Sequence, residues 1–175
     1  RSHTAAQDYT GALDAYAQLA RVDRADAERT AEVARVLGYA DRNAESALAW
    51  RQALQLAPER RTDWLLPLAW QTLWSGDAAA ARSLFSEAHA EGIGLPETWR
   101  GLAQACAALD RHPCAAEAWR KLLADQPDDR AAQRGLARAL LWSDDPAGAR
   151  EIYATLLQAD PSDADARLGL AQSDN

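Results

Sequence analysis

The sequence predicts an all-α fold in which pairs of antiparallel helices repeat along the chain. Three observations support this: a composition rich in helix formers, similar segments spaced by about 34 residues, and small and aromatic residues at fixed places in each segment. Alanine makes up about a quarter of the residues, whereas valine, isoleucine and threonine are sparse. Such a composition favours helices over strands.

Length and charge exclude several classes of protein. The chain has 175 residues, with 26 Asp and Glu against 19 Lys and Arg, and a net charge of -7. The length suits one ordinary domain. An acidic chain binds nucleic-acid phosphates and anionic membrane surfaces poorly, so neither is expected as the main partner. No apolar run in this segment is long enough to span a membrane.

Prolines that follow apolar helical runs reveal the repeat. Pro127 and Pro161 are 34 residues apart, and Pro58 lies 69 residues before Pro127. The longer spacing corresponds to two repeats with one extra residue. A fixed period of this length is typical of helical repeat proteins.

Each repeat carries the same pattern of residue sizes. An apolar residue followed by alanine lies in the first helix, a small residue opens the second helix, an aromatic residue comes four positions later, and alanine or leucine follows three positions after that. In chain order these positions are Val33-Ala34, Leu68-Ala69, Leu102-Ala103 and Leu136-Ala137; Ser46, Ala81, Ala115 and Ala149; Trp50, Phe85, Trp119 and Tyr153; and Ala53, Ala88, Leu122 and Leu156. Small residues let the two helices approach closely, and the aromatic residue fills the groove between repeats.

The predicted elements follow this pattern in order. Residues 1–26 are expected to supply the second helix of an incomplete repeat, with Ala12, Tyr16 and Leu19 at the small, aromatic and apolar positions. Four full repeats follow, at about 27–61, 62–95, 96–129 and 130–163, and residues 164–175 begin a further one. The whole chain, 1–175, is therefore expected to be one fragment of a longer array.

Local residues mark the expected helix ends. Residues suited to N-caps, to first helical turns and to a helix C-terminus are, respectively, Asp77 and Asp145, Pro113 and Pro146, and Gly92. Pro67 lies near the first turn of a first helix, where we expect tolerance or a slight kink rather than a break.

This pattern resembles the tetratricopeptide repeat, a helix–turn–helix unit of about 34 residues, over essentially the whole chain. The resemblance implies a right-handed superhelical solenoid of antiparallel helix pairs, with about four full repeats and a half repeat at each end. It also implies a non-enzymatic scaffold whose first helices line a concave groove for a partner.

No group of residues predicts an active site, a metal site or a cofactor site. His3, His89 and His112 are not at metal-ligand spacing. The sequence contains no Gly-rich phosphate loop and no GxSxG motif. We therefore expect no catalytic residues, no metal and no cofactor.

Cys106 and Cys114 flank the turn of one predicted hairpin and form neither a CxxC motif nor a zinc site. A disulfide between them would imply an oxidising compartment. The other interpretation, which we favour, is two small buried apolar residues.

The predicted groove contains seven candidate partner-binding residues on first helices: Tyr39, Trp70, Trp74, Arg100, Arg134, Arg138 and Trp142. The flat rings would stack on a sugar or hold a partner helix, and the arginines would pair with partner carboxylates. The alternative for Trp74 and Trp142 is packing against the first helix of the next repeat. The alternative for each arginine is an ordinary solvated surface.

Four other tryptophans are interpreted as structural. Trp50 and Trp119 hold the aromatic core position, and Trp64 and Trp99 open first helices.

A narrower resemblance rests on short segments: Leu73-Trp74-Ser75-Gly76-Asp77 and Leu141-Trp142-Ser143-Asp144-Asp145, with Asp63-Trp64-Leu65 and Gln133-Arg134-Gly135-Leu136. They resemble the periplasmic tetratricopeptide regions of bacterial outer-membrane exopolysaccharide export proteins of the Pel and poly-N-acetylglucosamine systems. This resemblance implies a periplasmic array, preceding an outer-membrane barrel in a longer protein, that recruits a polysaccharide deacetylase or hydrolase.

The same resemblance implies that the array guides a polysaccharide toward a pore. A partly deacetylated polymer is cationic, so the acidic chain would attract it weakly and salt would screen the attraction. The alternative is a cytoplasmic adaptor that binds a peptide or a partner helix in the same groove.

Overall fold

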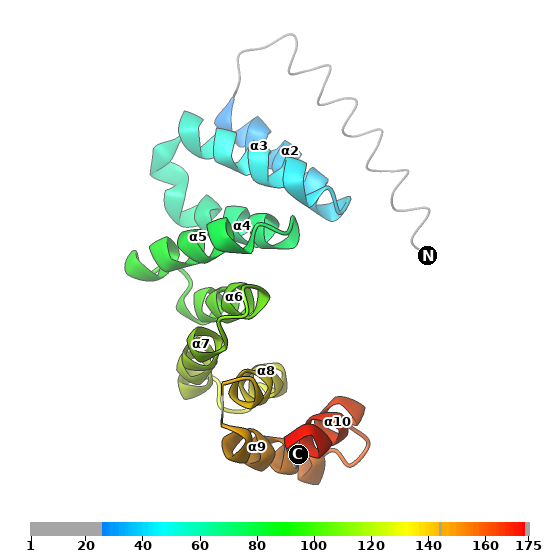
Figure 1. Cartoon of the computed structure of the whole chain (residues 1–175). Coiled ribbons are helices and arrows are strands. Elements are labelled where there is room, and N and C mark those ends of the chain that lie inside the picture. The colour runs from blue at the N-terminus through cyan, green and yellow to red at the C-terminus, as the bar shows by residue number, and fades with distance from the viewer. Residues whose placement is uncertain (1–25, 144, 174–175) are drawn as a thin grey trace. The chain divides into compact units, whose positions relative to one another are not determined.

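A computed structural model describes residues 26–143 and 145–173 of the chain. Within these ranges every regular element is a helix (Figure 1). The helix predicted within residues 1–26 lies outside the described residues, except for Asp26. The chain forms two compact units, the first ending at Ile93 and the second beginning at Gly94.

Each unit is a succession of antiparallel helix pairs. The helices of the first unit are α2 (Ala27–Tyr39), α3 (Asn43–Leu56), the 3-10 turn η1 (Pro58–Arg60), α4 (Arg61–Trp74) and α5 (Ala78–Ala90). The helices of the second unit are α6 (Leu95–Ala108), α7 (His112–Asp125), α8 (Arg130–Leu141), α9 (Pro146–Ala159) and α10 (Ala164–Ser173). Within a unit, each helix packs against the next one along the chain.

Small residues allow this close packing. The four first-helix alanines and the four residues that open the second helices are fully buried: Ala34, Ala69, Ala103 and Ala137, and Ser46, Ala81, Ala115 and Ala149. Ser46 is the one polar member of the set, and its hydroxyl donates a 2.6 Å hydrogen bond to the Ala34 carbonyl. That bond satisfies a polar group that would otherwise be costly to bury.

The aromatic residues form the core next to these alanines. Trp50, Phe85, Trp119 and Tyr153 are all buried, as predicted. In the second unit the Trp119 ring covers Gly135 of α8 so closely that an added Cβ would lie 2.4 Å from ring carbon Cε2. Tyr153 covers Gly169 of α10 in the same way, at 2.3 Å. Each aromatic ring of the second unit therefore contacts helix backbone, not a side chain, of the following repeat.

The turns between paired helices share one geometry. The residue after the first helix has a positive φ at Asp41 (56°), Gly76 (96°) and Asp110 (55°). In each case the following N–H bonds a carbonyl five residues back, as from Arg42 to Leu37. This motif satisfies carbonyls that a helix C-terminus leaves free.

The predicted helix ends agree with the structure. The carboxylates of Asp77 and Asp145 accept bonds from the N–H groups of Ala80 and Gly148, which makes both residues N-caps. Gly92 follows α5 with a φ of 68°. Helix α4 runs through Pro67 without interruption, so the expected tolerance of that proline is confirmed.

The preferred interpretation of the two cysteines is wrong. Cys106 at the end of α6 and Cys114 at the start of α7 form a disulfide, with Cα atoms 5.8 Å apart. Cys106 is fully buried, as expected, but the sulfur atoms are bonded. The tight turn between the helices explains the pairing, because it brings the last turn of one helix beside the first turn of the other.

The contact between Trp119 and Gly135 generates a stability prediction. Gly→Ala inside a helix usually stabilises a protein by about 0.5–1 kcal/mol. At Gly135 we expect the opposite, a loss of about 1–3 kcal/mol, because the buried ring cannot move away from the new methyl group. Thermal and urea unfolding of Gly135→Ala would measure it.

Gly38→Ala is the matched control, because a Cβ there would meet only the end of the Gln71 side chain, at 2.7 Å. It should unfold close to the original protein. An alanine variant at Gly135 that is as stable as the original chain would contradict the proposed packing.

Candidate binding pockets

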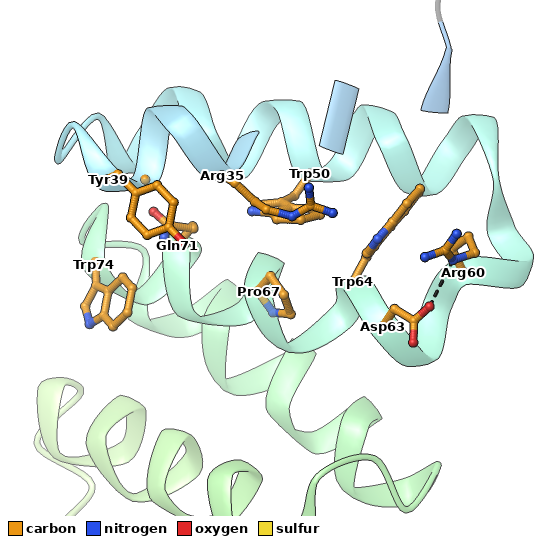
Figure 2. Close-up of a pocket in the computed structure, with 10 residues that line it drawn as sticks. Arg35, Tyr39, Trp50, Arg60, Asp63, Trp64, Pro67, Gln71 and Trp74 are labelled. Carbon is orange, nitrogen blue, oxygen red and sulfur yellow. Dashed lines mark hydrogen bonds and ion pairs between the residues drawn. The ribbon is translucent and has the colours of Figure 1, made fainter. Parts of the chain in front are cut away.

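The first unit contains a pocket of about 490 Å³ between α2, α3 and α4 (Figure 2). We call it the α2–α4 pocket. Its lining residues are Arg35, Gly38, Tyr39, Trp50, Arg60, Asp63, Trp64, Pro67, Gln71 and Trp74. Residues 63, 67, 71 and 74 recur at helical spacing, so one face of α4 supplies much of the wall.

Two buried tryptophans form the floor of this pocket. Trp50 of α3 and Trp64 of α4 have ring centroids 6.1 Å apart, and each is almost completely buried. The guanidinium of Arg35 lies 5.7 Å from the Trp50 centroid, and that of Arg60 lies 5.0 Å from the Trp64 centroid. Both positions allow a cation–π interaction.

Two exposed aromatic residues form the rim. Tyr39 is 69% exposed and Trp74 is 56% exposed. Trp74 stacks on Trp70, with centroids 5.4 Å apart, and Trp70 meets the edge of Phe85 at 5.0 Å. Trp70 therefore supports the Trp74 ring from behind and does not itself line the pocket.

The polar groups of the α2–α4 pocket differ in how they are satisfied. Arg60 pairs with Glu28 and, at 2.9 Å, with Asp63. The side-chain oxygen of Gln71 is buried and has no hydrogen-bond partner. A buried acceptor of this kind is available to a donor that enters the pocket.

The second unit contains a pocket at the equivalent place, of about 320 Å³, between α6, α7 and α8. We call it the α6–α8 pocket. Its lining residues are Gln104, Ala107, His112, Trp119, Gly135, Arg138, Ala139 and Trp142. Trp119 takes the place of Trp50 in the repeat, and Trp142, which is 63% exposed, takes that of Trp74. The His112 ring lies 6.1 Å from the Trp142 ring.

Two of the predicted groove arginines link consecutive repeats. Arg100 of α6 bonds the carboxylate of Asp129 at 2.6 Å, and Arg134 of α8 bonds that of Asp163 at 2.9 Å. Asp129 and Asp163 also accept backbone bonds from the N–H groups of residues 132 and 166, at the starts of the next first helices. Each pair spans 29 residues of sequence.

These contacts lower the pKa values of both aspartates. Burial raises the pKa of Asp129, but the Ala132 N–H and the Arg100 guanidinium outweigh it, so the net pKa lies below the usual range. The pKa of Asp163 is lowered first by the Ala166 N–H and then by Arg134. Both carboxylates thus stay ionised at neutral pH.

The seven predicted residues therefore divide into three groups. Tyr39 and Trp74 meet in the α2–α4 pocket, and Arg138 and Trp142 meet in the α6–α8 pocket. Trp70, Arg100 and Arg134 line neither pocket. Whether any of the seven binds a partner stays a prediction.

Several lining residues were not predicted as site residues. Trp50 and Trp119 were assigned to the core, and they are buried, yet one face of each reaches a pocket. Gln71 and Pro67 could have been found from the helical spacing that starts at Asp63. His112 belongs to a second helix, and no feature of the sequence places it beside Trp142.

The described residues include no group of three or more His, Cys, Asp or Glu side chains that could hold a metal ion. Among them there is also no helix long and apolar enough to cross a membrane.

Residues 110–173 match the family model of the tetratricopeptide repeat. No curated protein sequence matches the chain. The sequence match covers α7 to α10 and therefore lies within the second unit.

Solved structures extend the likeness to most of the chain. MamA (residues 41 to the end) from Desulfovibrio magneticus has a TM-score of 0.77 at 16% identity, over 89% of this chain and 88% of that one. YrrB, described as a protein of this repeat type with an unusual peptide-binding site, has a TM-score of 0.73 at 16% identity, over 92% and 82%. A tetratricopeptide repeat protein from Parabacteroides merdae has a TM-score of 0.73 at 15% identity, over 84% of this chain and 58% of that one.

The all-α fold is therefore that of a tetratricopeptide-repeat array. The chain spans less than two thirds of the Parabacteroides protein. At these identities the likeness concerns the fold.

The Arg100–Asp129 pair generates a prediction about acid unfolding. A lowered folded-state pKa means that ionised Asp129 stabilises the fold above its ordinary pKa, and that this stability is lost as pH falls through the folded-state value. Asp129→Asn should cost about 1 kcal/mol at pH 7, because asparagine keeps the cap but loses the charge. The deficit should shrink toward zero as pH falls below about 4.

Urea unfolding of both proteins from pH 7 to pH 3 measures this difference. Asp128→Asn, a change at the exposed neighbouring residue, is the control and should follow the original protein throughout. A deficit for Asp129→Asn that is independent of pH would show that the charge has no role.

Proposed function

We propose that the chain is a non-enzymatic protein-interaction scaffold that holds a segment of a partner protein in its two pockets. One observation carries the proposal. Each unit presents a pocket at the same place in the repeat, with a buried tryptophan on the floor and an exposed tryptophan on the rim.

The exposed rings support this proposal. An exposed tryptophan presents a large apolar area to water, and such residues are common among those that dominate binding energy. Packing between repeats is not what Trp74 and Trp142 supply, since more than half of each side chain is exposed. The peptide-binding site in the name of the YrrB structure concerns that protein, and it suggests the same type of ligand here.

A finer proposal follows the resemblance in the repeat turns. We propose that the array is periplasmic, belongs to a bacterial exopolysaccharide export protein, and binds a polysaccharide deacetylase or hydrolase and its polymer. The disulfide supports an oxidising compartment, and flat exposed rings suit stacking on sugars. A cytoplasmic adaptor is the alternative, and the state of the two cysteines bears on it directly.

The disulfide therefore generates a prediction about compartment. In protein taken from its native cells with thiols blocked at lysis, we expect Cys106 and Cys114 to resist alkylation until a reductant is added. Mass spectrometry of the alkylated peptides measures this, and protein reduced beforehand is the control. Cysteines that are already alkylated before reduction would favour the cytoplasmic adaptor.

The rim tryptophans generate a prediction about binding. The double variant Trp74→Ala/Trp142→Ala should weaken partner binding by about thirtyfold, a hot-spot effect of about 2 kcal/mol. Its helical content and melting temperature should change little, because both rings are exposed. Calorimetric titration with a periplasmic polysaccharide deacetylase, and with a partly deacetylated N-acetylglucosamine oligomer at low and high salt, measures the effect.

Leu48→Ala is the matched control, since Leu48 is 62% exposed and lines neither pocket. If neither probe binds, the export proposal fails. Pull-downs with the original chain and the double variant then decide the general proposal, which fails if both capture the same proteins.

A further inference from the structure

The two pockets share a charge feature. In the described part of the chain, Arg35 in the α2–α4 pocket and Arg138 in the α6–α8 pocket form no ion pair. The arginines around them are engaged by carboxylates, as in the pairs of Arg60 with Asp63 and of Arg100 with Asp129. Each pocket thus has one guanidinium whose charge no carboxylate of the described residues neutralises.

The surroundings of Arg35 fix where that charge lies. Its guanidinium lies over the Trp50 ring on the floor of the pocket, as Figure 2 shows. Asp63 is the only carboxylate among the described residues that line the pocket, and Arg60 holds it at 2.9 Å. A guanidinium on an aromatic face keeps its N–H groups at the ring edge free to bond a carboxylate.

The same pocket offers a second polar contact. The buried oxygen of Gln71 has no hydrogen-bond partner, and Gln71 lies beside Tyr39 and Trp74 at the rim (Figure 2). A peptide N–H would satisfy this oxygen. The pocket therefore has an acceptor for a peptide backbone, a cation for an acidic side chain, and two exposed rings for an apolar one.

The α6–α8 pocket repeats the arrangement with other residues. No Asp or Glu is among the described residues that line it, and its cation is Arg138. The rings of Trp142 and His112 lie together at one side, and Trp119 forms the floor. The two pockets share no residue, yet both combine an unneutralised arginine with a buried and an exposed tryptophan.

From this arrangement we infer that the bound partner segment is an acidic peptide in which Asp or Glu alternates with large apolar residues. A carboxylate binds Arg35 or Arg138, and a neighbouring apolar side chain packs on Trp74 or Trp142. The inference rests on the proposed scaffold function and specifies its ligand. The chain is acidic overall, with a net charge of -7, so an acidic segment is repelled elsewhere and held at these two places.

The charge of these two pockets disfavours a cationic polymer within them. An ammonium group would meet the guanidinium of Arg35 or Arg138, while the nearby carboxylates are already paired. A cationic chain would therefore have to bind another surface of the molecule.

Three short synthetic peptides test the inference by isothermal titration with the whole chain. They share one pattern of alternating polar residues with leucine and phenylalanine, and their polar residue is Glu, Gln or Lys. We expect the Glu peptide to bind about tenfold tighter than the Gln peptide, in line with the strength of a charge-assisted hydrogen bond. Its affinity should fall as salt is added.

The double variant Arg35→Gln/Arg138→Gln should remove this tenfold preference and leave binding of the Gln peptide unchanged. The matched control is Arg51→Gln/Arg120→Gln, because these exposed arginines hold equivalent positions on α3 and α7 and line neither pocket. Thermal unfolding of each variant checks that the fold is intact. The control should keep the full preference for Glu.

Equal binding of the Glu and Gln peptides, tighter binding of the Lys peptide, or a preference that survives the double variant would each overturn the inference. So would the absence of binding by all three peptides. The scaffold proposal would stand in these cases if Trp74→Ala/Trp142→Ala still weakens binding of a captured partner. Loss of the Glu preference only in the pocket variant would support the inference.

Discussion

The contact between an aromatic residue of one repeat and the helix backbone of the next determines much of the second unit. Trp119 lies on Gly135 and Tyr153 lies on Gly169, at distances that leave no room for a side chain. This contact sets how closely consecutive helix pairs approach, and it turns the far face of Trp119 toward the α6–α8 pocket. In the first unit Pro67 takes the glycine position and lines the α2–α4 pocket. The candidate sites are therefore consequences of repeat packing.

The fold was predictable because its core positions are set by residue size. The small, aromatic and apolar positions recur every 34 residues from Trp64 onward, and all of them are buried. Caps were predictable for a similar reason, since Asp77 and Asp145 act on backbone groups only three residues away. The extra residue in the longer proline spacing was predicted without a location. It falls between Pro58 and Trp64, where the 3-10 turn η1 leads into α4.

The candidate site was less predictable because it depends on contacts between distant residues. Nothing local distinguishes Arg134, which pairs with an aspartate 29 residues later, from Arg138, which forms no ion pair in the described part of the chain. Helical spacing placed both on one face but gave no information about partners. The exposure of Trp74 and Trp142 was open for the same reason. The cysteine pairing failed because composition favoured burial and contains no information about the distance between two side chains.

The backbone contacts also bear on how such an array can grow by duplication. A hairpin copied from one loop to the next would separate Trp119 from Gly135 and Arg134 from Asp163, because each pair joins two successive hairpins. A segment copied from the middle of one second helix to the middle of the next would keep each bulky residue with its bare backbone partner. The natural unit of exchange along this chain is therefore offset by half a hairpin from the unit that the eye sees in the ribbon.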